Sequence, residues 1–267
     1  MRKPSVILVI GASTGIGEAT ARILSSRGHI VYGSSRDAVR VSADGVRALS
    51  VDIFDDGSMS KAIDLIIQAE GRIDGVIYSA GFYCAGAVEE TPMTDVQAQM
   101  QAYFFGAVRC AQFILPQMRA QNSGRLIFMS STAGSVAIPF HAAYSASKGA
   151  LGKWTEALAY EVNPFNIHAS YIEAGAIKTN APNAMRSGRM PMEVYAAPRE
   201  TAESSFKDAL ANGMPVLRAG KAIANAFEHK RPKIRYRIGG AGKVFPVIQA
   251  LIGERLFRRL MAKSFGI

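Results

Sequence analysis

Residue types that build metal sites and disulfide frameworks are scarce in this chain of 267 residues. Only two cysteines, Cys84 and Cys110, and four histidines are present. Two isolated thiols do not make a disulfide framework, and the cysteines and histidines match no metal-binding spacing. We therefore expect no metal site, and two free thiols in a reducing compartment.

Long apolar runs are also lacking, although 49% of the residues are hydrophobic. No run reaches the roughly 18 residues of a helix that spans a bilayer. The apolar stretch 6–10 is too short for a signal peptide, and Gly11 begins a turn directly after it. We expect a cytoplasmic protein.

Acidic residues are fewer than basic ones, 21 against 31, and the formal net charge is +10. Such an excess attracts anions of any kind, including phosphates, nucleic acids and membrane surfaces. Much of it lies late in the chain, at 229–237 and 255–263. No nucleic-acid-binding motif accompanies these residues, so we expect a solvated basic surface and no nucleic-acid partner.

Apolar, β-branched runs alternate with longer amphipathic stretches through most of the chain. This alternation predicts right-handed crossovers and a mostly parallel sheet. The expected fold class is α/β, a Rossmann-type doubly wound parallel sheet of about seven strands with helices on both faces. The predicted strands are 5–10, 29–33, 46–51, 74–79, 125–130, 167–172 and 234–238. The predicted helices are 15–27, 58–70, 94–119, 142–162 and 216–229.

Two later segments depart from this alternation. Residues 180–215 hold four prolines and four methionines with little periodicity, and they are longer than a connection requires. We expect a substrate lid there, with a surface excursion as the alternative. Residues 243–267 predict a C-terminal helical extension that packs on its own domain or on a partner subunit, or contacts a membrane surface weakly. The whole chain, 1–267, is expected to form a single domain.

A glycine-rich loop joins the first predicted strand to the first predicted helix. Its sequence is Gly11-Ala12-Ser13-Thr14-Gly15-Ile16-Gly17. Glycines there permit a tight turn and a close approach of the backbone to a pyrophosphate, which the helix N-terminus faces. The second strand ends in Arg36 and lacks the acidic residue that binds the ribose 2′-hydroxyl of NAD. With Ser13 and Thr14 as further donors, this favours NADP(H) over NAD(H).

Tyr144 and Lys148 are four residues apart in a predicted helix, so they lie one above the other on the same face. A lysine ammonium beside a phenol favours the phenolate and lowers the tyrosine pKa from about 10. Such a phenol exchanges a proton with a carbonyl or an alcohol near neutral pH. Ser131, at the end of an apolar run, can add a hydrogen bond to the same oxygen. Ser131, Tyr144 and Lys148 are the predicted catalytic residues.

Six motifs occur in a recognisable order and approximate spacing. They are the loop Gly11–Gly17, Asp52, Ser79-Ala80-Gly81, Ser131, Tyr144-x-x-x-Lys148 and Gly175-x-Ile177-x-Thr179. On these motifs the chain resembles the short-chain dehydrogenase/reductase family over about residues 5–240. The strand with Arg-Tyr-Arg-Ile-Gly and the tail 257–265 further resemble bacterial reductases similar to hydroxysteroid and retinol dehydrogenases.

The resemblance implies roles for the matching residues. It makes Tyr144 the general acid in reduction and the base in oxidation, lets Lys148 bind the nicotinamide ribose, and has Ser131 polarise the substrate oxygen. It implies cofactor contacts by Asp52 and Ile53 beside the adenine, by Ser79, Ala80 and Gly81 beneath the cofactor, and by Gly175, Ile177 and Thr179 at the nicotinamide end.

The chain departs from the family pattern at several positions, and Tyr103 is the most telling. The family places an asparagine there, three residues before a glycine that Gly106 matches, where it helps to hold a water-linked proton relay to the lysine. Ile10, Tyr78 and Ala174 also replace the usual residues. The alternative to an enzyme is therefore a catalytically impaired NADP(H)-binding sensor or scaffold.

The predicted substrate is a lipophilic ketone, aldehyde or alcohol, such as a steroid-, retinoid- or polyketide-like molecule. Apolar residues that this layout places around the site suggest it: Phe82, Tyr83, Phe140, Met185, Met190 and Met192. Tyr103 and His141, one helical turn before Tyr144, are further candidates for the substrate pocket. The resemblance also implies a homodimer or homotetramer that pairs through the fourth and fifth helices.

Overall fold

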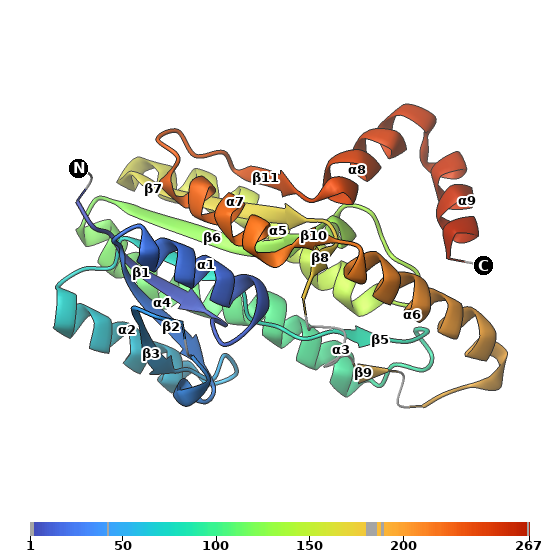
Figure 1. Cartoon of the computed structure of the whole chain (residues 1–267), viewed down its shortest axis with the longest axis horizontal. Coiled ribbons are helices and arrows are strands. Elements are labelled where there is room, and N and C mark those ends of the chain that lie inside the picture. The colour runs from blue at the N-terminus through green and yellow to red at the C-terminus, as the bar shows by residue number, and fades with distance from the viewer. Residues whose placement is uncertain (1–2, 42, 180–185, 188–189, 266) are drawn as a thin grey trace.

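Seven short strands form one parallel sheet, in a computed structural model that describes residues 3–41, 43–179, 186–187, 190–265 and 267 (Figure 1). Its order is β11-β7-β6-β4-β1-β2-β3. The order reverses between β1 and β4, which creates a crevice at the carboxyl ends of these strands. The strands are β1 (Val6–Ile10), β2 (Ile30–Ser35), β3 (Val46–Ser50), β4 (Gly75–Tyr78), β6 (Gly124–Ser131), β7 (Ile167–Ala174) and β11 (Arg235–Ile238).

Helices cover both faces of the sheet, and the side chains of β1 show why. Leu8 and Ile10 belong to the core on one face, whereas Ile7 and Val9 belong to the core on the other, because successive side chains of a strand point to opposite faces. A strand that is apolar at every position therefore needs a helical layer on each side. One layer contains α1 (Gly15–Ser26) and α7 (Val216–Glu228); the other contains α2 (Asp56–Glu70), α4 (Gly106–Ala120) and α5 (Ala142–Val162).

The predicted helix 94–119 is divided by a change of helical geometry. It consists of α3 (Met93–Met100), a π-helical turn at Gln101–Phe105, and α4. A π turn accommodates one extra residue and occurs often at functional sites. The expected doubly wound α/β fold is confirmed, with its seven strands and five predicted helices.

The segment 180–215 contains a helix that its sequence did not predict. α6 (Ala196–Ala211) buries Ala202, Phe206 and Leu210 along one face. Short strand pairs flank it: β5 (Cys84–Ala85) pairs with β9 (Arg186–Ser187), and β8 (Ile177–Lys178) pairs with β10 (Met214–Pro215). The prolines and polar residues obscured the spacing of four residues that marks this helix.

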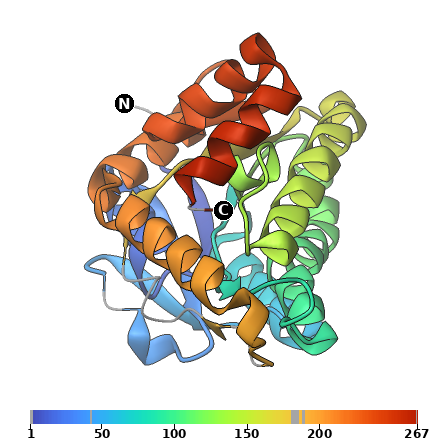
Figure 2. The ribbon, with the colours of Figure 1, turned by 90° about the vertical axis from the view of Figure 1, so that its right-hand side faces the viewer.

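The predicted C-terminal helix pair is present as α8 (Gly240–Ile252) and α9 (Glu254–Ser264). Gly253, with a φ of +78°, joins them, and the rings of Phe245 and Phe257 meet at 6.3 Å. Figure 2 shows α6, α8 and α9 at the end of the molecule where the strands terminate. Within the described residues, no helix is long and apolar enough to cross a membrane, and no acidic, histidine and cysteine side chains gather as metal ligands.

Candidate active site

A cavity of about 870 Å³ opens at the carboxyl ends of the parallel strands. Its floor consists of the residues that follow β1, β2, β4, β6 and β7, together with Tyr144 and Lys148 of α5. Its roof consists of α6, α8 and α9, which supply Phe206, Leu210, Phe245, Met261 and Phe265. Predicted residues that line the cavity are Gly11, Ser13, Thr14, Gly15, Ile16, Arg36, Ile53, Ser79, Ala80, Gly81, Phe82, Tyr83, Tyr103, Ser131, Tyr144, Lys148, Gly175, Ile177 and Thr179.

The glycine-rich loop turns sharply between β1 and α1. Gly11 has a φ of +83°, and a Cβ there would lie 2.7 Å from the Cα of Ala80. A Cβ on Gly17 would lie 2.1 Å from the carbonyl oxygen of Gly11. Thr14, which precedes α1, makes no side-chain cap, so the first N–H groups of the helix are free to bind an anion.

The end of β2 brings two cations and an unpaired hydroxyl to the same cavity. Arg36 and Arg40 both line it. The Oγ of Ser34 is buried without a hydrogen-bond partner, which a bound polar ligand would remedy. Sequence reasoning missed Arg40; it lies on a short helical turn whose start is capped by Asp37, which accepts the N–H of Val39.

Ser131 ends β6, and a close contact brings α5 against it. Its Oγ donates to the carbonyl of Ala174 at 3.4 Å and accepts the N–H of Ala133 at 3.1 Å. A Cβ on Gly134 would lie 2.7 Å from the carbonyl carbon of Lys148, so only glycine allows this approach. The strand end and the helix are therefore held together at the site.

Lys148 is buried, and its Nζ donates to the carbonyl of Met129 at 2.6 Å. The same atom lies 3.7 Å from the ring centroid of Tyr103 and 5.8 Å from that of Tyr144. Burial lowers the pKa of Lys148 to about 7, because a low-dielectric site disfavours the charged amine.

Tyr144 is enclosed by other phenols. Its ring centroid lies 4.9 Å from that of Tyr83 and 5.4 Å from that of Tyr103, and its hydroxyl donates to the Tyr83 hydroxyl at 3.5 Å. Burial raises the pKa of Tyr144 well above its usual value, and Tyr83 and Tyr103 add to this rise. The predicted lowering of this pKa is wrong for the protein alone: a hydrogen bond with Ser131 lowers it, but burial outweighs that effect.

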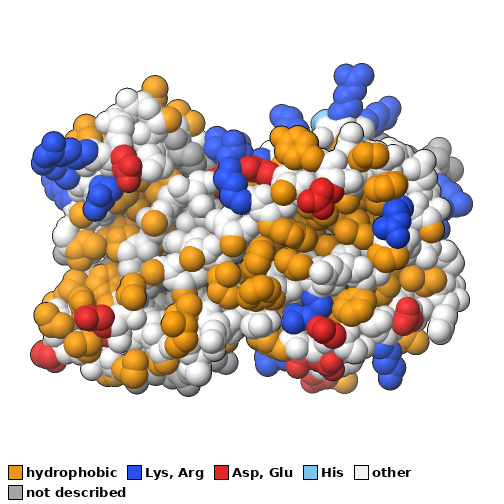
Figure 3. All heavy atoms as spheres, turned by 180° about the vertical axis from the view of Figure 1, so that it is seen from behind, with side chains coloured by type: hydrophobic (Ala, Val, Ile, Leu, Met, Phe, Trp, Pro, Cys, Tyr) orange, Lys and Arg blue, Asp and Glu red, His pale blue; other side chains and the backbone are white. Residues whose placement is uncertain are grey.

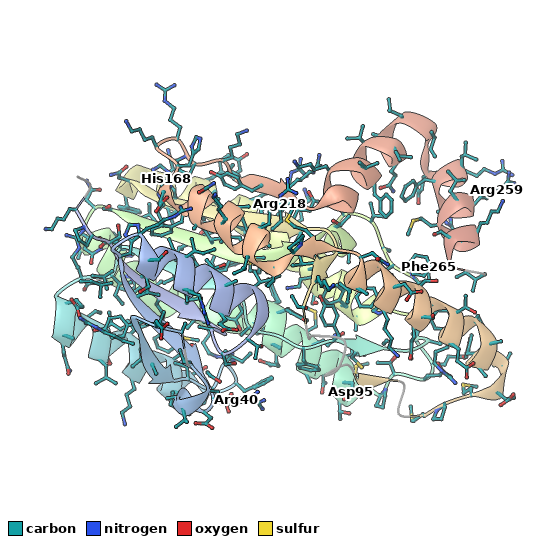
Figure 4. The ribbon with its side chains drawn as sticks, in the orientation of Figure 1. Arg40, Asp95, His168, Arg218, Arg259 and Phe265 are labelled. Atoms are coloured by element: carbon teal, nitrogen blue, oxygen red, sulfur yellow. The ribbon has the colours of Figure 1, made fainter. Side chains whose placement is uncertain are left out.

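The roof provides apolar walls that the sequence did not predict. Phe206 contacts Tyr83 at 5.5 Å between ring centroids, and Leu210 follows one turn later on α6. Figure 4 shows Phe265 on the side of α9 toward α6, and Arg259 pointing away from the molecule. The spacing of Ala202, Phe206 and Leu210, four residues apart, was the signal available for α6.

Other predicted residues lie elsewhere. Gly17, Asp52 and His141 do not line the cavity. Gly17 packs on Gly11, and Asp52 accepts the N–H of Phe54. His141 is buried behind Phe206, and the centroids of the two rings lie 4.4 Å apart. Met185 falls outside the described residues. Phe140, Met190 and Met192 do not line the cavity either, and the two methionines are 52% and 41% exposed.

A protein-family model described as short chain dehydrogenase matches residues 5–189. The chain belongs to the short-chain dehydrogenase family. A 3-ketodihydrosphingosine reductase of Bacteroides thetaiotaomicron is 34% identical over 258 residues, which cover 94% of this chain and 92% of the relative. Membership makes the protein an oxidoreductase that acts on CH–OH groups with a nicotinamide cofactor.

Solved structures share the fold. A short-chain dehydrogenase from Streptomyces avermitilis has a TM-score of 0.86 and 28% identity, covering 98% of this chain and 96% of its own. An alcohol dehydrogenase from Thermococcus sibiricus, complexed with 5-hydroxy-NADP, has a TM-score of 0.73 and 17% identity. The match covers 90% of this chain and 98% of that one. A family member from Burkholderia phymatum, in complex with NAD, has a TM-score of 0.78 and 19% identity. The match covers 93% of this chain and 92% of that one. Both kinds of cofactor therefore occur on this fold.

Proposed function

We propose that this protein uses NADP(H) to interconvert a lipophilic ketone or aldehyde and its alcohol. The observation that carries the proposal is the arrangement of one cavity. Ser131, Tyr144 and Lys148 line it beside apolar side chains of the roof, and Arg36 and Arg40 line it where β2 ends. One cavity thus holds groups for proton transfer, for an apolar substrate and for a phosphate.

The residues present fit a phosphorylated nicotinamide nucleotide. The turn Gly11–Gly17 and the uncapped start of α1 suit its pyrophosphate. Arg36, Arg40 and the orphaned Ser34 hydroxyl suit a ribose 2′-phosphate. Ile53, Ala80, Ile177 and Thr179 line the same cavity and are proposed to contact the remaining parts. When bound, the nicotinamide supplies or accepts the hydride.

The protein's own groups manage the proton. Tyr144 remains a neutral phenol near neutral pH because burial raises its pKa well above the usual value. A neutral phenol donates a proton to the oxygen of a carbonyl as it is reduced. The Ser131 hydroxyl is proposed to donate a second hydrogen bond to that oxygen, and Lys148 to hold the cofactor and favour the phenolate in the reverse direction.

The substrate class follows from the roof. Phe206, Leu210, Phe245, Met261 and Phe265 offer apolar surface to the substrate, and the name of the Bacteroides relative specifies a keto substrate. We infer that α6 acts as the lid. Its Arg199 forms an ion pair with the buried Glu90, which also accepts the Met192 N–H at 2.9 Å.

The direct test measures NADPH oxidation with a series of ketones of increasing chain length. We expect turnover to rise with chain length, and Tyr144→Phe to lose at least about 1,000-fold in kcat while still binding NADPH. Turnover unchanged in Tyr144→Phe would refute the proton-transfer assignment. Tight NADPH binding without turnover of any member would favour the sensor or scaffold alternative.

The cofactor preference has its own test. Removing the guanidinium of Arg36 or of Arg40 should weaken NADPH binding by about tenfold, because either change removes a charge-assisted contact to phosphate. NADH lacks that phosphate, so its affinity should stay unchanged. Titration of Arg36→Ala and Arg40→Ala with both nucleotides checks this, with Arg22→Ala on the exposed side of α1 as the control. Equal losses for NADPH and NADH would contradict the preference.

Two surfaces suggest partners. The face seen in Figure 3 carries hydrophobic side chains across its middle. Phe105, directly before α4, is 44% exposed, and Tyr160, on α5, is 75% exposed. We propose that two copies pair there, as family members commonly oligomerise, and sedimentation of Tyr160→Glu should then show monomers.

The second surface is the outer side of α8 and α9. Leu251, Leu256 and Leu260 are 79%, 48% and 50% exposed, and Arg255 and Arg259 lie one turn apart beside the latter two. Leucines beside arginines suit an anionic bilayer, near the cavity that Met261 lines. Weak co-sedimentation with anionic vesicles should disappear in the double variant Arg255→Glu, Arg259→Glu; binding that is unchanged would contradict this contact.

A further inference from the structure

Tyr103 and Lys148 form an aromatic–cation pair inside the cavity wall. The Lys148 Nζ lies 3.7 Å from the centroid of the Tyr103 ring, within the distance of about 6 Å at which a cation is attracted to an aromatic face. Both side chains are buried, at 6% and 5% exposure. The attraction is stronger in such a site because water does not compete for the ammonium.

The fold holds this ring firmly. Tyr103 lies in the π-helical turn 101–105, and the Tyr78 hydroxyl donates to the neighbouring Ala102 carbonyl at 2.7 Å. On the other side the ring packs on Gly81, where a Cβ would lie 2.0 Å from the Tyr103 Cε1. The Tyr103 hydroxyl has no hydrogen-bond partner among the described residues. The contact with Lys148 therefore uses the ring and not the hydroxyl.

The groups around Lys148 offer little other compensation for its charge. The Met129 carbonyl of β6 accepts its hydrogen bond. The rings of Tyr103, in the π turn, and of Tyr144, on α5, flank it. Among the described residues no carboxylate is paired with it, and burial alone accounts for the low pKa of about 7. One carbonyl, the close face of Tyr103 at 3.7 Å and the more distant ring of Tyr144 at 5.8 Å are thus the groups that stabilise the buried ammonium.

We propose that the face of the Tyr103 ring binds the Lys148 ammonium. Tyr103 is then a positioning residue that keeps this lysine charged and in place. The negative face of the ring stabilises the Lys148 ammonium electrostatically, at a position where the family pattern places an amide. The consequence for turnover rests on the proposed function, because it requires that Lys148 takes part in the reaction. The pairing itself does not, since it exists in the protein without cofactor.

The primary test titrates Lys148 in the cofactor-free protein. Its Cε chemical shift is followed by NMR in protein labelled with ¹³C-lysine, and the signal is assigned from Lys148→Arg. Loss of the ring in Tyr103→Leu should lower the Lys148 pKa by about one unit, because the charged form loses its aromatic partner. Tyr103→Phe keeps the ring and should titrate like the parent protein.

A series of nearly isosteric variants guards against a folding defect. Phenylalanine and its fluorinated forms at position 103 keep the shape but withdraw negative charge from the ring face, which weakens attraction to a cation. The Lys148 pKa should fall stepwise with fluorination. A titration that does not move in this series or in Tyr103→Leu overturns the proposal, as does a Tyr103→Phe variant that shifts as far as Tyr103→Leu.

Activity provides a second readout. A lower Lys148 pKa means that the ammonium loses its proton at lower pH, so the alkaline limb of kcat/KM should move down by the same amount in Tyr103→Leu and stay in place in Tyr103→Phe. Tyr103→Asn restores the amide of the family pattern; if it raised kcat above that of the parent and left the titration unmoved, a water relay and not the ring would be limiting. Absence of turnover in the parent would refute the proposed function and leave the NMR result decisive for the pairing.

Discussion

The floor and the roof of the cavity are built by different physical means. On the floor, backbone atoms meet so closely that only glycine fits, at Gly17 against Gly11 and at Gly134 against α5. The helices of the roof are held mainly by side chains, through the Arg199–Glu90 ion pair and the rings of Phe206 and Phe245, with the backbone pairing of β8 and β10 at the end of α6. The floor is therefore rigid and suited to fixed chemistry, whereas the roof can change to suit a substrate.

The largest effect on cofactor affinity should come from crowding the floor. In Gly17→Ala the new Cβ would lie 2.1 Å from the Gly11 carbonyl oxygen, so the turn must open and its N–H groups lose their arrangement. We expect NADPH affinity to fall by at least about 100-fold, measured by fluorescence titration, because several anion contacts are lost together.

The matched control for this change lies on the roof. Gly240→Ala adds the same atom at the start of α8, where nothing lies within 4 Å, and it should leave NADPH affinity unchanged. If Gly240→Ala weakened binding as much as Gly17→Ala, the division into a rigid floor and a tolerant roof would be wrong.

A smaller and more local effect is expected from loosening the roof. Glu90 is fully buried and pairs with Arg199, so Arg199→Met leaves a buried carboxylate without its cation. Hydrogen exchange of the α6 amides should quicken at least about tenfold, with NADPH affinity unchanged. Lys207→Met breaks an exposed pair with Glu203 on the same helix and serves as the control. Faster exchange throughout the sheet would instead show that roof and floor open as one unit.

The floor was also the part that sequence reasoning predicted well. Strand periodicity and the Gly11–Gly17 spacing are local signals, and the order of a doubly wound sheet brings strand ends such as Ser131 together without further information. Arg40 was missed because its approach depends on the short turn that follows Arg36. Met185, predicted for the pocket, lies outside the described residues.

The roof and the electrostatics were predicted poorly for a physical reason. Whether Phe206 or Met190 faces the cavity depends on where α6 docks, and contacts between distant segments, such as the Glu90–Arg199 ion pair, contribute to this. The pKa of Tyr144 depends on how many apolar groups surround it, and burial is a property of the assembled fold. Spacing alone places Lys148 near the phenol, but it does not reveal that its Nζ points to Met129 and Tyr103.

The smallest expected effect isolates the roof's share in substrate choice. Phe206 is buried against Tyr83 and His141 and lines the cavity, so Phe206→Ala removes apolar contact surface from the substrate side. KM for long-chain ketones should rise about fivefold, equivalent to about 1 kcal/mol of lost contact, and KM for short-chain ketones should change less. The KM for NADPH should remain the same, because the cofactor is expected on the floor. A rise in KM that is equal for all chain lengths would mean that Phe206 supports the site without touching the chain, and substrate choice would then have to be sought at Phe245 and Met261.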